Sequence, residues 1–112
     1  MTPAAFRKLA LALDGAVEGA HGGHADFRAS GRVFATMGYP DAKWAMVKLT
    51  PEQQGVLCSS EPAMFQPVKG TWGLRGATLL RLGATDARTA RSALAMAMGN
   101  LRAVKPTKSR SR

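Results

Sequence analysis

The chain has 112 residues, 46% of them hydrophobic and 21% charged, which predicts one globular domain and excludes two. It is basic, with 16 Lys and Arg against 7 Asp and Glu and a net charge of +9, so a polyanionic partner is favoured. One cysteine, Cys58, excludes an internal disulfide and a zinc site built from cysteines, and no apolar run approaches the ~18 residues of a membrane span.

The N-terminal part predicts a helix followed by a connection. Thr2 can cap the helix, Pro3 suits its first position, and apolar residues follow at helical spacing. The Asp14-Gly15 pair ends this helix, because glycine readily takes a left-handed conformation. We expect the glycine-rich residues 15–23 to form a connection.

A tight hairpin is predicted next. Residues 26–29 and 32–37 are compatible with strands, and Ser30-Gly31 between them suits a two-residue turn. In that register Phe27 lies opposite Phe34, a favourable aromatic pair across the two strands.

A third strand and a capped helix follow the turn signal at residues 38–41. The strand covers 44–49, and its side chains alternate between a wholly apolar phase and a mixed phase that holds Trp44, Met46 and Lys48. In the segment Thr50-Pro51-Glu52-Gln53, Thr can cap a helix and Gln can complete a capping box, so a short helix should run to about residue 60.

The last third predicts two strands and a helix. Residues 65–68 form a weak strand, residues 70–73 a loop or bulge, and residues 77–82 a stronger strand. Thr85 caps the final helix, and Asp86 interacts with its dipole.

The predicted order of elements is α-β-β-β-α-β-β-α. Hairpins dominate, so we expect an α+β domain over residues 1–102, with an antiparallel sheet of about five strands and the helices packed on one face. Residues 103–112 hold four basic residues and no acid, and we expect a disordered basic tail there. The remaining 102 residues keep a charge of +5, the difference between +9 and +4.

One polar cluster has the residue types of a metal or catalytic site. Glu18, His21, His24 and Asp26 fall within nine positions, and such groups can bind a divalent ion. Their spacing matches no known helical ligand pair, so we interpret the segment as a polar loop in which one His and Asp26 satisfy backbone groups. We expect no metal, no cofactor and no catalytic residue, and therefore not an enzyme.

Basic residues on strands and loops are the stronger functional signal. A sheet covered by helices on one face leaves the other face open, and the mixed phase of 44–49 would make that face basic and partly aromatic. The alternative places Trp44 and Trp72 in the core, which we favour for each tryptophan taken singly. The candidate nucleic-acid-binding residues are Arg28, Arg32, Lys43, Lys48, Lys69, Arg75 and Arg81.

The chain resembles the MmcQ/YjbR family of small bacterial proteins over most of residues 2–105. The segments that carry the resemblance are TPAAFRKLALAL, the loop from Glu18 to His24, HADFRASGRVFATMGYP, WAMVKLTPEQQ, EPAMFQPVKGTWGLRGATLLRL and the final helix through AMAMGNL. The family often has an aromatic residue where this chain has Met98. The resemblance implies a CyaY-like α+β fold and the description double-wing DNA-binding, and it supplies no catalytic residues.

Three functions stay open at this point. The first is a cytoplasmic module that binds DNA or RNA through the Ser30-Gly31 hairpin tip, the loop from Lys69 to Arg75 and the open sheet face. The second is a protein-interaction module that uses the open face or an edge strand. The third is a small enzyme or metal protein that uses the loop from Glu18 to Asp26. We expect a monomer and no membrane contact, with the oligomeric state left open.

Overall fold

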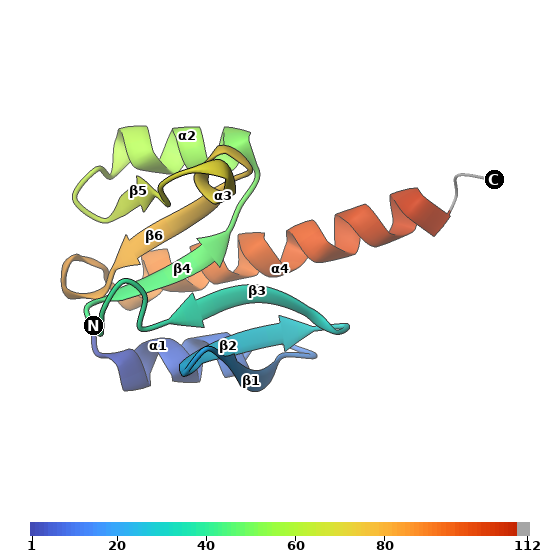
Figure 1. The fold of residues 1–112 in the computed structure, drawn as a ribbon, viewed down its shortest axis with the longest axis horizontal. Helices are drawn as coiled ribbons and strands as arrows, with labels where there is room; N and C mark the ends of the chain where they lie inside the picture. The colour runs from blue at the N-terminus through green and yellow to red at the C-terminus, as the bar shows by residue number, and fades with distance from the viewer. Residues whose placement is uncertain (110–112) are drawn as a thin grey trace.

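A computed structural model describes the backbone of residues 1–109 and the side chains of residues 1–102 (Figure 1). Its elements in chain order are α1 Pro3–Leu11, β1 Val17–His21, β2 His24–Ala29, β3 Arg32–Met37, β4 Trp44–Lys48, α2 Pro51–Ser60, β5 Phe65–Pro67, α3 Thr71–Leu74, β6 Ala77–Arg81, a 3-10 turn Leu82–Ala84, and α4 Ala87–Ser109.

The strands form one antiparallel sheet in the order β1-β2-β3-β4-β6-β5. Helices α1 and α4 pack together and cover one face of it, as Figure 1 shows. The predicted α+β class with an antiparallel sheet is confirmed, and the described residues form six strands where about five were expected.

The main core lies between this sheet and the helices. Phe6 of α1, Phe27 of β2 and Leu94 of α4 are completely buried, and the rings of Phe6 and Phe27 meet edge to face with centroids 6.2 Å apart. On β4 the apolar phase, Ala45 and Val47, faces this core, as its alternation predicts. The other phase is left for the opposite face of the sheet.

The expected connection over residues 15–23 is wrong, because it contains strand β1. Val17–His21 pairs with all but the last residue of β2, and Gly22 and Gly23 form the turn between them with φ of 57° and 80°. Both values lie in the left-handed region, as a tight hairpin turn requires. A glycine inside the strand and two at its end conceal the strand pattern in the sequence.

The predicted Ser30-Gly31 turn is present, with φ of 54° and 77°, but the pairing beyond it differs. Phe27 lies opposite Ala35, not Phe34, because the register shifts by one residue between Phe27 and Arg28. The extra residue belongs to β3, and it allows both Phe34 and Ala35 to enter the main core. A bulge of this kind leaves no trace in the alternation of apolar residues.

Residues 70–73 were expected as a loop or bulge, and they contain the short helix α3. Gly73 packs so tightly that a Cβ there would overlap the carbonyl oxygen of Val68. The side-chain amide of Gln54 in α2 donates to the carbonyls of Gly73 and Ala77, at 3.0 Å each. These contacts fix α3 against the sheet.

Two of the three predicted helix caps are confirmed. The hydroxyl of Thr2 accepts from the N–H of Ala5, and Thr50 forms the full capping box with Gln53. The third prediction is wrong: Asp86 caps α4 by accepting from the N–H of Thr89 at 2.7 Å, whereas the Thr85 hydroxyl donates to the carbonyl of Arg81. The carboxylate caps because it immediately precedes the first helical residue.

Helix α4 is assigned through Ser109. The disordered tail expected over residues 103–112 therefore overlaps this helix over residues 103–109. Its last three residues, 110–112, lie outside the described part of the chain.

Candidate functional site

The face of the sheet opposite the main core carries the mixed phase of β4. Trp44 and Lys48 flank Met46 there, and Met46 forms a second, small apolar cluster with Ala77 and Leu79 of β6. The predicted phase of β4 is therefore confirmed, and the sheet has a second usable surface.

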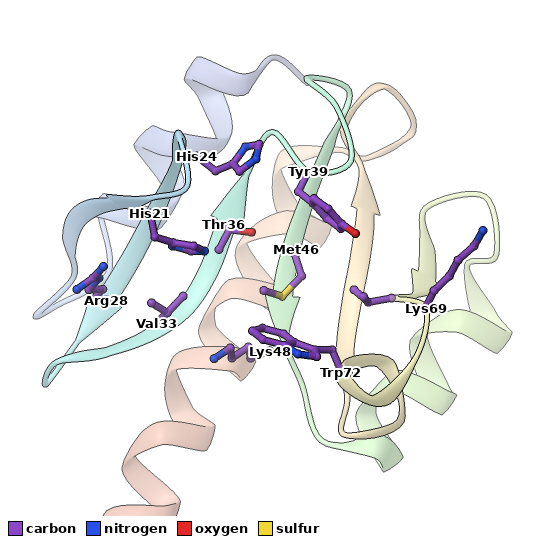
Figure 2. Close-up of a pocket in the computed structure, with 11 residues that line it drawn as sticks. His21, His24, Arg28, Val33, Thr36, Tyr39, Met46, Lys48, Lys69 and Trp72 are labelled. Carbon is purple, nitrogen blue, oxygen red and sulfur yellow. The ribbon is translucent and has the colours of Figure 1, made fainter.

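This surface is hollowed into a cavity of about 560 Å³, drawn in Figure 2, which we call the open-face hollow. Its volume lies within the roughly 300–1,000 Å³ typical of ligand sites. No described acidic residue lines it. Its lining residues are His21, His24, Arg28, Val33, Thr36, Tyr39, Met46, Lys48, Val68, Lys69 and Trp72.

Two walls of different character enclose the hollow. His21, His24 and Arg28 come from the β1–β2 hairpin on one side, as Figure 2 shows. On the opposite side the Trp72 ring stands over the hollow, and the Tyr39 ring joins the two sides by meeting His24 edge to face with centroids 6.3 Å apart. Tyr39 and Trp72 are 51% and 61% exposed. The site is thus cationic and imidazole-rich at one wall and aromatic at the other.

Asp26 supports the cationic wall from behind. It is completely buried, although it lies on the open face of β2 opposite Thr36. Its carboxylate accepts from Nε and Nη2 of Arg28 at 2.8 and 3.0 Å and lies 2.6 Å from Nδ1 of His21. The hydrogen bonds from Arg28, helped by His21, lower the pKa of Asp26 from 3.8 to about 2 against the opposing effect of burial. The carboxylate is therefore ionised at neutral pH.

Both tryptophans stand against cations outside the main core. The preferred core assignment is wrong for Trp72, which is exposed, whereas Trp44 is half-buried against the small cluster of Met46, Ala77 and Leu79. Lys48 Nζ lies 5.6 Å from the centre of the Trp72 ring, and the Arg81 guanidinium carbon lies 4.5 Å from that of Trp44. Such contacts combine positive charge with a flat apolar surface.

The structure divides the seven candidate nucleic-acid-binding residues among three places. Arg28, Lys48 and Lys69 line the open-face hollow, although the Lys69 amine points away from it in Figure 2. Lys43 and Arg81 line a separate hollow of about 530 Å³ near the N-terminus. Arg32 and Arg75 are exposed at the Ser30-Gly31 hairpin and at the end of α3, respectively.

The polar cluster from Glu18 to Asp26 does not assemble as a unit. Glu18 faces the helices, where its carboxylate lies 3.2 Å from Nε of Arg7, while His21, His24 and Asp26 are on the open face. Among the described residues no three His, Cys, Asp or Glu side chains are grouped as metal ligands. The expectation that Asp26 satisfies backbone groups is wrong, since its partners are side chains.

Several lining residues were absent from the sequence-based candidates. Thr36 lies opposite Met46, so its place follows from the pairing of β3 with β4, which the sequence does not disclose. Tyr39 comes from a turn and Trp72 from α3, and neither segment has a periodic pattern that would indicate which way its side chains point.

Searches against family models, curated proteins and solved structures found no match for this chain.

None of the helices within residues 1–109 combines the length and hydropathy that crossing a membrane requires. Burial raises the pKa of the Cys58 thiol, because desolvation disfavours the thiolate.

Proposed function

We propose that this protein binds nucleic acid and that the open face of the sheet is its main contact surface. The observation that carries the proposal is the composition of the open-face hollow: Arg28 and Lys48 stand with the exposed rings of Tyr39 and Trp72, and no acidic residue of the described part lines it. Phosphates pair with such cations, and bases stack on such rings. The resemblance to the MmcQ/YjbR family agrees with this function, and the site of action would be the cytoplasm.

Contacts of this type favour backbone recognition over sequence readout. Cations on strands neutralise phosphates whatever the base, and aromatic stacking tolerates every base. The hairpin tip with Arg32 and the segment from Lys69 to Arg75, which contains α3, would add outlying phosphate contacts. We therefore expect weak sequence selectivity.

A salt titration tests the proposal. We expect a fluorescently labelled single-stranded oligonucleotide to bind at low salt. Log K should fall linearly with log salt, with a slope of about −0.7 for each phosphate neutralised. Fluorescence anisotropy over a range of about 50–200 mM salt measures that slope. Absence of binding at low salt, or an affinity that salt does not change, would overturn the proposal.

Charge-removing variants locate the surface. Lys48→Gln should make the salt slope shallower by about 0.7, the contribution of one phosphate contact. Arg91→Gln is the matched control, because Arg91 is exposed on α4, which covers the other face of the sheet. Equal effects of the two variants would contradict the assignment of the open face.

A further inference from the structure

The buried carboxylate of Asp26 is the most unusual feature of the open face. A carboxylate removed from water is costly unless other groups compensate it. Here one cation and one imidazole cover it, Arg28 through two hydrogen bonds and His21 through one close contact. The same two residues also line the open-face hollow.

Gly19 provides the space for this arrangement. A Cβ at position 19 would lie 2.9 Å from Oδ1 of Asp26 and 3.1 Å from Nε of Arg28. The φ of Gly19 is not in the left-handed region, so the backbone itself does not call for glycine there. The residue at this position is small because the ion pair beneath it needs the room.

The consequence is a cationic wall with fixed geometry. Asp26 occupies Nε and Nη2 of Arg28, and Nη1 has no hydrogen-bond partner among the described residues. The contact of Asp26 with His21 uses Nδ1, which carries the proton because an ionised carboxylate can only accept, so Nε2 of the neutral ring is an acceptor. Groups held in place lose little conformational entropy when an anion binds, and charge-assisted hydrogen bonds are the stronger kind.

The rest of the hollow suits a flat apolar ring. Val33, Met46 and Val68 contribute apolar lining, and the exposed ring of Trp72 stands at one side with Lys48 beside it. A ligand that fills the hollow therefore has an anionic end and a planar end. A terminal phosphate ester carries about −1.5 to −2 charges near neutral pH and three acceptor oxygens, more than an internal phosphodiester offers.

We propose that the open-face hollow is a subsite for a nucleoside monophosphate, with the phosphate on Arg28 and Lys48 and the base against Trp72 and Tyr39. The ligand is either a free nucleotide or the 5′-phosphorylated end of a strand, which share this chemistry. The inference rests on the proposed function, since it assigns a ligand to the same surface.

Two titrations of the full chain test the subsite and separate the sources. Calorimetry with adenosine monophosphate, adenosine and inorganic phosphate should show the nucleotide binding at least about tenfold more tightly than either fragment, as expected when both ends contribute. Anisotropy should show a 5′-phosphorylated single strand binding more tightly than the same strand with a 5′-hydroxyl.

The outcomes distinguish the subsite from the general proposal. Salt-dependent binding of both strands with equal affinity, and no binding of the nucleotide, would overturn the subsite and leave nucleic-acid binding standing. Nucleotide binding with no strand binding would support the subsite with a free nucleotide and overturn nucleic-acid binding. Failure of every ligand would overturn both.

Variants identify the groups responsible. Arg28→Gln removes the anchored cation, and Trp72→Ala removes an exposed ring whose loss should leave the fold intact. Each should weaken nucleotide binding about tenfold, whereas Arg91→Gln should change it less than about twofold. Gly19→Ala displaces the Asp26–Arg28 pair without changing the charge, so it should weaken nucleotide binding several-fold. Affinities within twofold of the unaltered chain for both Arg28→Gln and Trp72→Ala would overturn the proposal, and circular dichroism checks that each variant is folded.

Discussion

At the scale of single residues, Asp26 shows how a side chain on the solvent side of a sheet can be part of the protein interior. The strand pattern predicts that residues 26–29 form a strand, and this is correct apart from the earlier start at His24. It does not predict that Asp26 and Glu18, both candidates in one cluster, lie on opposite faces. That separation follows from β1, which the glycines conceal.

The lowered pKa of Asp26 predicts a specific dependence of stability on pH. Its folded-state pKa of about 2 lies below its usual 3.8, so the ionised carboxylate is favoured more in the folded chain than in the unfolded chain. The resulting stabilisation is present above about pH 4 and is lost as the pH falls towards 2. We estimate it at about 1–2 kcal/mol, a reduced figure because Arg28 and His21 are partly in solvent.

Asp26→Asn tests this dependence. Urea unfolding at several pH values should give a variant less stable at neutral pH by at least that amount, because Arg28 then lacks its anion, and the difference should shrink as the pH falls. Asp14→Asn is the control, since Asp14 is exposed and its carboxylate has no hydrogen bond within residues 1–102. A constant offset between Asp26→Asn and the unaltered chain at all pH values would contradict the assigned role.

At the scale of elements, local signals account for what the sequence predicts well. The capping box from Thr50 to Gln53 and the Ser30-Gly31 turn are encoded by adjacent residues, and both are present. Strand β1 and helix α3 are short, each contains one glycine and has others beside it, and their positions depend on distant partners such as β2 and Gln54. Because Trp72 belongs to α3, the aromatic wall of the site was the least predictable part.

Two glycines should respond in opposite ways to alanine. Gly99 is exposed in α4 and a Cβ there meets nothing within 4 Å, so Gly99→Ala should raise the free energy of unfolding by about 0.5–1 kcal/mol through helix propensity. Gly73→Ala should lower it by more than about 2 kcal/mol, because the new Cβ overlaps the carbonyl of Val68. Thermal and urea unfolding of both variants measure these changes, and a destabilised Gly99→Ala would contradict the packing described for α4.

At the scale of the whole molecule, the two faces of the sheet are packed differently. One face is closed by α1 and α4 over the main core, and the other holds the open-face hollow. The net charge of +9 indicates a basic protein, but its distribution depends on which side each strand presents. Composition therefore predicts an anionic partner, and the fold indicates which surface would meet it.

This arrangement predicts unequal local stability. Strands β3 and β4 lie in the middle of the sheet, whereas β1 is an edge strand with mostly exposed residues. Among strands β1 to β4, amide hydrogen exchange in the native state should therefore be fastest in β1 and slowest in β4. Equal protection of β1 and β4 would show that β1 is stabilised by something other than its pairing with β2.

The bulge in β3 determines which face of the sheet each of the following residues of this strand occupies. Without the extra residue, Phe27 would pair with Phe34, and every side chain from Ala35 to Met37 would change sides of the sheet. Thr36 would then enter the core and Met37 would fill the hollow. Two hairpins of nearly identical composition, differing by one residue in this strand, would therefore present opposite surfaces to a ligand.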